Sequence, residues 1–399
     1  MILCDTLGAK HMSLYGYHRK TTPLLERLVE EEGFTVYSNC WSTSCWTPPA
    51  HASLFTGMYP REHGTHEANS LLATEPYTLP EILQMQGYET VGISSNSLVS
   101  NFFGFSRGFG SFRDLNRYNL FHMEKNILEA VAKKKGKFNK LLEIFRLSGK
   151  ERNPTIIFKY IMNFLKNRIA LRIHMGALRD ATPYTKRALK AGLDSLAGAR
   201  KPLFLFINLM QVHFDYNPPS ETRGRWSDSR SPYRRLTHKR FRYYGKKRYP
   251  IEVLQYFQDL YDEEVLYLDK VVYEFCKKVS TDNALLIITS DHGENFGEEG
   301  HYGHMLSLTD AVCKIPLLIK YPGKNRAGIS DRLCQINDLF AMIQDVVESP
   351  LPTPESSVSL LSSSARKKAL IEIVHPEIWL EQVYNKELFR FCFRREVTV

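Results

Sequence analysis

The chain has 399 residues, of which 43% are hydrophobic and 24% charged, and its formal net charge is +10. This length suits one large domain or two of ordinary size, and the composition excludes an intrinsically disordered chain. The longest apolar run, residues 202–212, is well short of the roughly 20 residues that a membrane span needs.

No signal-peptide pattern opens the sequence, so we expect a cytoplasmic protein, with the reservation that a leader could have been removed before Met1. The seven cysteines are scattered and show no C-x-x-C spacing. This pattern argues against a disulfide framework and against a structural zinc site, and it favours a reducing compartment. We expect most of these cysteines to be buried as small apolar residues.

The predicted elements alternate between strands and helices. In chain order they are a strand at 1–5, a helix at 21–33 with a Thr cap and a closing Gly, a helix starting at 51 after two prolines, a helix and strand within 78–96, helices over 119–200, a strand at 201–213, a helix at 251–279, strands at 283–293 and 314–323, and a last strand within 356–377. This rhythm predicts an α/β fold with a large, mostly parallel central sheet covered by helices on both faces.

Polar residues follow three of the predicted strands directly. They are Asp5, His213 and the pair Asp291-His292. In open α/β sheets the working residues lie at the carboxyl ends of the strands. An Asp-His-Gly sequence alone is most often a helix cap beside a half-exposed histidine. Together with Asp5 at another strand end, however, it favours a divalent cation bound by carboxylate and imidazole.

The stretch "TSCWTPPAHASLFTGMYPREHG" (residues 43–64) contains two candidate nucleophiles, Cys45 and Thr47. It does not stand alone. The segments "ILCDTLGAKHMSLYGY", "TPPAHASLFTGMYPREHG", "FINLMQVHFDYNPP", "LYDEEVLYLDKVV" and "TSDHGENFGEEGHYGHMLSLTDAVCKIPLLIKYPG" resemble, in order and spacing, the motifs of the sulfatase family of the alkaline-phosphatase superfamily. The resemblance covers residues 1 to about 345 and implies an alkaline-phosphatase-like fold and a metal-dependent ester hydrolase.

The resemblance also distinguishes between the two nucleophiles. Sulfatases carry C-x-P-x-R, whose Cys or Ser becomes formylglycine, followed by L-x-T-G. In that register Thr47 takes the nucleophile position and His51 takes that of the Arg, while Cys45 lies two residues too early. Formylglycine is therefore not expected. The chain should be similar to superfamily members that use an unmodified threonine, whose hydroxyl needs a metal to be activated.

The resemblance implies a metal site made of Asp5, Thr47, Asp291 and His292. His213, in the family's H-x-x-Y-x-P-P pattern, is expected to contact the transferred group or to protonate the leaving group, although a buried structural histidine is a close rival. His304 is the expected catalytic residue of the loop after Asp291, and His301 is its competitor as a substrate contact; for both, a structural role is about as probable.

Three positions depart from the family pattern. Relatives read D-x-x-R-x-D where this chain has Asp5, Gly8 and Lys10, and His51 replaces an arginine. Fewer carboxylates favour Mn²⁺ or Zn²⁺ at least as much as Ca²⁺, which prefers six to eight oxygen ligands. These departures bring sulfatase turnover into question without removing the metal site.

We assign residues 1–345 to one catalytic domain that contains a basic helical insertion at about 119–180 and a basic loop at about 220–250, and we expect residues 346–399 to pack on the same domain. The two basic regions indicate an anionic partner. An ester on a glycan or a lipid headgroup is the simplest one. The helices could rest on an anionic membrane. Nucleic acid is weaker, because no binding module accompanies the basic and aromatic residues at 234–249.

Three functions therefore remain open at the level of sequence. The leading one is hydrolysis of a sulfate or phosphate ester through Thr47. The second is transfer of the same group from Thr47 to a sugar or lipid hydroxyl. The third is a non-catalytic relative that binds an anionic polymer. The oligomeric state is not predicted.

Overall fold

The computed structural model describes residues 1–115, 181–235, 249–279, 283–323, 327–377 and 393–398. The predicted basic helices at 119–180 lie outside the described residues, and so do residues 236–248 of the predicted basic loop. Within the described part no helix combines the length and the apolar character that crossing a membrane requires. The six cysteines among these residues are buried and carry free thiols.

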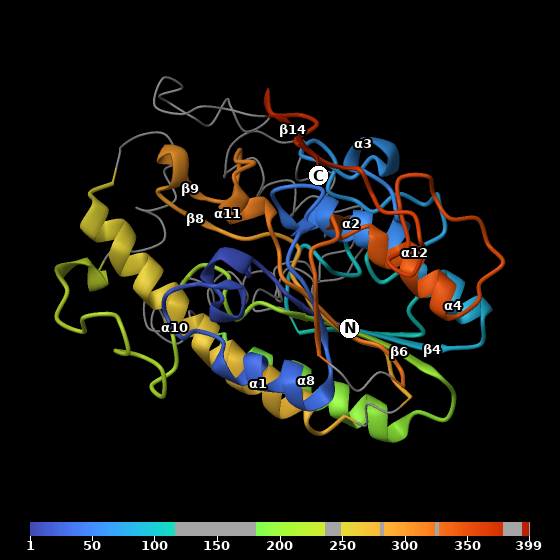
Figure 1. The fold of residues 1–399 in the computed structure, drawn as a ribbon, viewed down its shortest axis with the longest axis horizontal. Coiled ribbons are helices and arrows are strands. Elements are labelled where there is room, and N and C mark those ends of the chain that lie inside the picture. Colours follow the sequence, from blue (N-terminus) through green and yellow to red (C-terminus); the bar gives the residue numbers. More distant parts are fainter. Residues whose placement is uncertain (116–180, 236–248, 280–282, 324–326, 378–392, 399) are drawn as a thin grey trace, which may run out of the picture. The chain divides into compact units, whose positions relative to one another are not determined.

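An eight-stranded sheet forms the centre of the fold (Figure 1). Its order is β11 (Gly328–Ser330), β2 (Thr35–Tyr37), β10 (Leu317–Lys320), β7 (Leu286–Thr289), β1 (Ile2–Cys4), β6 (Leu203–Leu209), β4 (Glu89–Ser94) and β5 (Ser111–Asp114). β10 runs antiparallel to both of its neighbours, whereas the other pairs are parallel. The predicted α/β class and mostly parallel sheet are confirmed.

Helices cover both faces of this sheet, with α1, α8 and α10 on one side and α2, α4 and α12 on the other (Figure 1). The helices are α1 (Pro23–Glu32), α2 (Thr47–Thr56), α3 (Pro60–His63), α4 (Leu79–Met85), α8 (Thr182–Gly198), α10 (Ile251–Cys276), α11 (Asp310–Cys313) and α12 (Asp338–Val346). Alternate residues of one strand enter opposite cores, so Ile2 and Cys4 pack with α10 while Leu3 packs with α2 and α12. Burial on both faces explains the continuous apolar runs in the sequence.

Three short two-stranded ladders accompany the main sheet. They are β3 (Cys40–Trp41) with β12 (Cys334–Gln335), β8 (Asn295–Phe296) with β9 (Tyr302–Gly303), and β13 (Lys368–Glu372) with β14 (Arg394–Thr398). The 3-10 turns are η1 (Ala9–His11), η2 (Ser13–Tyr15), η5 (Pro232–Arg235) and η6 (Glu298–Gly300). The ladder β8–β9 lies in the loop that follows β7, which also contains most of the predicted site histidines.

Two details of the helix starts differ from prediction. α2 begins at Thr47 and not after the two prolines, because proline has no N–H to lose in the first turn of a helix and its fixed φ suits that position. α1 is capped not by Thr22 but by Asp269 of α10, whose carboxylate accepts hydrogen bonds from the backbone N–H groups of Leu24 and Leu25.

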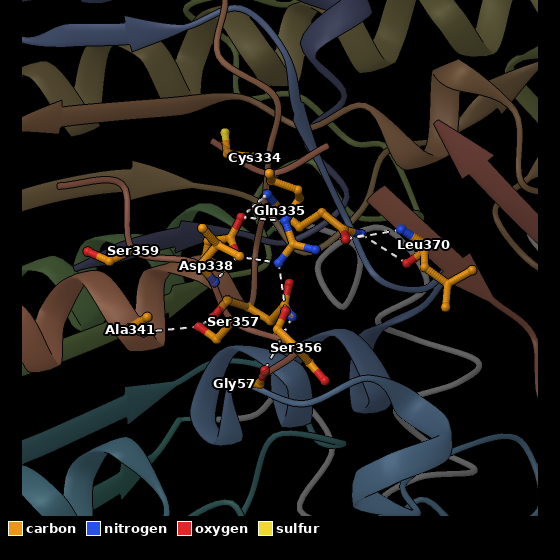
Figure 2. Close-up of polar contacts among 12 residues, drawn as sticks. Gly57, Cys334, Gln335, Asp338, Ala341, Ser356, Ser357, Ser359 and Leu370 are labelled. Carbon is orange, nitrogen blue, oxygen red and sulfur yellow. Dashed lines mark hydrogen bonds and ion pairs between the residues drawn. The ribbon is translucent and has the colours of Figure 1, made fainter. Parts of the chain in front are cut away.

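The segment after α12 is attached to the domain by a buried polar cluster. The guanidinium of Arg366 donates to both carboxylate oxygens of Asp338, at the start of α12, and to the hydroxyl of Tyr59. Figure 2 shows Asp338 among Gln335, Ser356 and Ser357. Residues 346–377 thus contact the domain at several described points. Whether the whole of 346–399 packs as one segment stays a prediction.

Candidate active site and metal centre

The carboxyl ends of β1, β4, β6 and β7 meet at one edge of the sheet, because these neighbouring strands are parallel. Asp5 follows β1, Asn96 lies two residues after β4, and Asp291 and His292 follow β7. The N-terminal turn of α2 brings Thr47 to the same place. Residues far apart in the sequence therefore form one cluster, as the strand-end rule predicts.

Asp5, Asp291 and His292 each direct one ligand atom to a common point. These atoms, two carboxylate oxygens and one imidazole nitrogen, lie within 4.8 Å of one another. All three side chains are fully buried. Burial raises the pKa of Asp5, and the neighbouring carboxylate of Asp291 raises it further. Two carboxylates in this position are costly without a compensating positive charge.

The hydrogen bonds of the two carboxylates leave specific oxygens without a donor. Oδ1 of Asp291 accepts from the backbone N–H groups of Thr6 and His292, and Oδ2 of Asp5 accepts from the side-chain amide of Asn96 at 2.6 Å. Among the described residues, no hydrogen bond reaches Oδ1 of Asp5 or Oδ2 of Asp291. Buried carboxylate oxygens without donors are what a cation would bind, so the residues present fit a divalent metal ion.

The imidazole of His292 has a fixed orientation. Its Nδ1 lies 3.0 Å from the carbonyl oxygen of Gly293. A carbonyl only accepts, so Nδ1 carries the proton and Nε2 presents its lone pair to the carboxylates. Burial lowers the pKa of His292 to about 3, which keeps the ring neutral near pH 7. A backbone carbonyl that fixes the tautomer is the usual outer partner of a histidine that ligates a metal.

The two candidate nucleophiles lie in different surroundings. The hydroxyl oxygen of Thr47 is 3.4 Å from Nε2 of His292 and 3.5 Å from Oδ2 of Asp5. Cys45 instead packs in an apolar cluster with Leu306, Leu308 and other side chains. Burial raises the pKa of its thiol well above the ordinary range, which disfavours the thiolate.

His51 lies one helical turn after Thr47, beneath the cluster. Its Nδ1 is 3.0 Å from the carbonyl oxygen of Thr47 and 3.5 Å from Oδ2 of Asp291. Its Nε2 contacts the side-chain amide of Asn208 in β6 at 2.9 Å. The ring is fully buried, and Phe105 and Phe206 lie edge-on to it. His51 therefore joins the first turn of α2 to β6, and its ring lies beside the carboxylate of Asp291.

His304 approaches the cluster from the loop after β9. Its ring centroid is 4.4 Å from that of His292 and 5.8 Å from that of His213. Nδ1 of His304 lies 3.0 Å from Oε1 of Glu294, and the hydroxyl of Tyr216 donates to Oε2 of the same carboxylate. Burial alone would lower the pKa of His304, but the carboxylates of Glu294, Asp5 and Asp291 together raise it, with Glu294 contributing most.

The two remaining predicted residues are placed differently. His213 follows β6, is half-buried, and its Nδ1 lies 2.7 Å from the carbonyl oxygen of Phe214. His301 is buried at the end of the turn between β8 and β9, directly before β9. His213 and His304 come from two different loops. The ring of His213 contacts that of His304, which in turn contacts the candidate metal ligand His292.

Sequence reasoning missed four residues of this site: Glu294, Asn96, Asn208 and Thr6. Asn96 closes the predicted strand "ETVGISSN", so the strand-end rule could have found it. Thr6 has a left-handed backbone conformation with φ of 60°, and its N–H donates to Asp291. Such strain in a buried residue is typical of functional sites. Nothing local in the sequence signals the partners of Glu294 or Asn208.

The departures at positions 8 and 10 have a structural reason. A Cβ on Gly8 would lie 3.1 Å from the carbonyl oxygen of Ala311, and one on Gly293 would lie 2.2 Å from the same atom. The loops after β1 and β7 therefore touch backbone to backbone, which leaves no room for a larger residue at position 8 without movement. Lys10 forms an ion pair with Glu298 at the protein surface.

The sheet order and the cluster of polar residues at its carboxyl edge agree with the alkaline-phosphatase-like α/β fold that the motifs imply. The sequence matches the sulfatase family over residues 1–349. The chain therefore belongs to the sulfatase family, as its motifs indicate.

Individual relatives are distant. The chain is 23% identical over 375 residues to an N-acetylglucosamine-6-O-sulfatase of Bacteroides thetaiotaomicron, covering 85% of this chain but 65% of that protein's length. Its fold is similar to that of the phosphonate monoester hydrolase of Agrobacterium radiobacter (TM-score 0.65, 15% identity, 100% of this chain and 88% of that one). It is also similar to the periplasmic domain of EptC from Escherichia coli in complex with Zn (TM-score 0.58, 18% identity, 93% and 87%).

Proposed function

We propose that this protein hydrolyses a sulfate or phosphate ester through the hydroxyl of Thr47 at a single divalent metal ion. One observation carries the proposal. The Thr47 hydroxyl lies within 3.5 Å of both Asp5 and His292, next to two buried carboxylate oxygens that lack a hydrogen-bond donor among the described residues. The proposed nucleophile therefore lies beside the side chains that would bind the metal.

Asp5, Asp291 and His292 would hold the ion, with the Thr47 hydroxyl beside it. When bound, the ion supplies positive charge that lowers the hydroxyl pKa and stabilises the negative ester oxygens. The two carboxylates and one imidazole suit zinc or manganese at least as well as calcium. His292 presents Nε2 because Gly293 holds its other nitrogen.

The chain's own residues then account for two displacements. Oγ1 of Thr47, which donates its proton toward Oδ2 of Asp5, forms a bond to sulfur or phosphorus, and the bond to the leaving alcohol oxygen breaks. His304, whose pKa the neighbouring carboxylate of Glu294 raises, would give the leaving oxygen its proton. Water next attacks the sulfur or phosphorus and gives a proton back to His304. The bond to Oγ1 of Thr47 then breaks, inorganic sulfate or phosphate leaves, and Oγ1 regains the proton that Asp5 had taken. His213 lies across from His304 and would bind the oxygens of the transferred group.

The substrate class follows less directly. The related N-acetylglucosamine-6-O-sulfatase acts on a sulfated sugar by its name. We propose an anionic ester on a glycan or a lipid headgroup for this chain, and its net charge of +10 would favour binding of such a substrate. Unmodified threonine makes a phosphate ester as suitable a substrate as a sulfate ester.

The test is a turnover panel with the purified protein. The wild type, Thr47→Ala and Thr47→Ser are assayed on p-nitrophenyl sulfate, p-nitrophenyl phosphate and bis(p-nitrophenyl) phosphate with Zn²⁺, Mn²⁺ or Ca²⁺, and the bound metal is measured. We expect turnover of at least one ester, lost with EDTA and in Thr47→Ala, and partly retained in Thr47→Ser.

Two other outcomes would replace the proposal. If the products appear on an added sugar or glycerol hydroxyl instead of as free sulfate or phosphate, the protein is a transferase. If the metal binds but no ester is turned over, and an anionic polymer binds equally well to the wild type and Thr47→Ala, the protein is a binding relative of the family.

A further inference from the structure

We infer that Glu264 of helix α10 is a positioning residue for His213. It holds both ends of the loop that carries this histidine, although it lies on a different element and is itself fully buried. The inference rests on the proposed role of His213 in binding the transferred group.

The contacts of Glu264 bracket His213 in the sequence. Its Oε2 accepts a hydrogen bond of 2.5 Å from the side-chain amide of Gln211, two residues before His213. Its Oε1 accepts one of 2.8 Å from the backbone N–H of Asn217, four residues after it. One carboxylate thus ties residues 211 and 217 together, so the seven-residue span around His213 cannot widen while both hydrogen bonds persist.

The same turn of α10 also holds the loop of a metal ligand. Tyr261, three residues before Glu264, accepts a hydrogen bond from the N–H of Gly8 and donates one to the carbonyl oxygen of Thr6. Thr6 follows Asp5 directly. One helical turn therefore fixes the loop after β1 and the loop after β6 relative to each other. The distance from His213 to the metal ligands depends on this turn.

If Glu264 only stabilised the fold, the neighbouring carboxylate of Glu263 would have the same role. Glu263 is equally buried and accepts from the backbone N–H groups of Trp226 and Ser227 and from the Ser227 hydroxyl. Those residues lie ten or more positions beyond His213. Glu263 is therefore a matched control: the same residue type, burial and helix, but another part of the chain.

The experiment compares Glu264→Ala with Glu263→Ala on the ester that the wild type turns over. We expect Glu264→Ala to lower kcat by about 10²-fold, because a displacement near 1 Å at a catalytic group costs that much. If the Glu263 carboxylate only stabilises the fold, Glu263→Ala should keep kcat within about threefold of the wild-type value. Gln211→Ala, which leaves the helix intact, provides the second variant if Glu264→Ala does not fold.

A double-mutant cycle separates positioning from instability. In the His213→Ala background, Glu264→Ala should lower kcat little further, because residues that act through one another are not additive. Equal losses for Glu264→Ala and Glu263→Ala, or fully multiplicative effects of Glu264→Ala and His213→Ala, would overturn the inference.

A spectroscopic readout keeps the inference testable if the proposed function fails. The imidazole ¹³Cε1–H signal of His213 is assigned by its loss in His213→Ala. It should shift in Glu264→Ala or Gln211→Ala and stay in place in Glu263→Ala. An unmoved signal in a folded Glu264→Ala or Gln211→Ala protein contradicts the positioning role, whatever the enzyme's activity. Absence of all turnover with a shifted signal would reject the proposed reaction alone.

Discussion

Nε2 of His292 lies 3.4 Å from the hydroxyl oxygen of Thr47, a residue 245 positions earlier in the chain. The imidazole is held there by the carbonyl of its own neighbour, Gly293, and the threonine by the first turn of α2. A strand end and a helix start thus place the proposed nucleophile and a candidate metal ligand side by side. Several expectations follow from this arrangement.

Asp5→Asn should make the metal-free protein more stable. Burial and Asp291 raise the pKa of Asp5 in the folded state, so the folded state is disfavoured above the carboxyl's unfolded pKa, and this penalty is present at neutral pH. We expect thermal unfolding in EDTA to show a gain of about 0.5–2 kcal/mol. Zinc at 100 times its Kd should stabilise the wild type by about 2.7 kcal/mol and the variant far less.

The control for this change is Asp194→Asn. Asp194 lies on α8, is exposed, and pairs with Lys190 one turn away. It should change neither the EDTA value nor the stabilisation by zinc. A wild type that zinc fails to stabilise, or an Asp5→Asn variant that gains as much from zinc as the wild type does, would contradict the metal site.

Glu294→Gln should move the basic limb of the pH–rate profile to lower pH. In the wild type burial lowers the pKa of His304, and the carboxylates of Glu294, Asp5 and Asp291 raise it, with Glu294 contributing most. Loss of the Glu294 charge should therefore lower the pKa of His304. If protonated His304 is the acid, kcat/KM then declines at lower pH than in the wild type, which a pH series on one ester measures. An unmoved limb would exclude His304 as that acid.

Gly293→Ala should damage the site through its backbone. The new methyl group would stand 2.2 Å from the carbonyl oxygen of Ala311 and 2.8 Å from Cα of Gly8, so the two loops must separate. Overpacking of this kind costs about 1–3 kcal/mol, and His292 moves with its neighbour. We expect a lower unfolding free energy and weaker zinc binding by calorimetry.

Gly198→Ala serves as the comparison, because a Cβ at Gly198 meets nothing within 4 Å. It should leave zinc binding unchanged and leave stability equal or higher by up to about 1 kcal/mol. Zinc binding by Gly293→Ala equal to that of the wild type would show that the close approach of the loops is unnecessary.

Arg366→Met should destabilise the protein strongly. The substitution leaves the carboxylate of Asp338 buried without its charged partner, and breaking such a pair from one side costs about 3–5 kcal/mol. Urea unfolding measures the loss. Arg230→Ala, which removes an exposed arginine near Asp228, should cost less than about 1 kcal/mol. Similar losses of unfolding free energy for the two variants would show that the Arg366–Asp338 pair does not stabilise the fold (Figure 2).

Much of this site was predictable from the chain, for a physical reason. Asp5 and Asp291 follow apolar runs of strand length, and parallel strands end at one edge. The direction of β10 was not predictable, since an apolar run is the same in either direction. The cap of α1 comes from Asp269, some 245 residues away, and Thr22 is locally the better candidate.

The buried carboxylates of α10 show the same limit. Glu263 and Glu264 belong to an amphipathic pattern in which a charged residue is normally assigned to the solvent face. They are buried because loops from other parts of the chain wrap over that turn of α10. Only the tertiary fold reveals their partners. The same holds for Glu294, whose partners His304 and Tyr216 come from two separate loops.

Trapping the covalent intermediate would identify the nucleophile. Turnover on the best ester is quenched in acid, and the peptide spanning residues 43–58 is analysed by tandem mass spectrometry, with Cys45→Ala as a control that should still turn over. We expect a sulfo or phosphoryl group on Thr47, in wild type and Cys45→Ala alike, and none in Thr47→Ala. A group or an aldehyde at Cys45, with activity lost in Cys45→Ala, would contradict it.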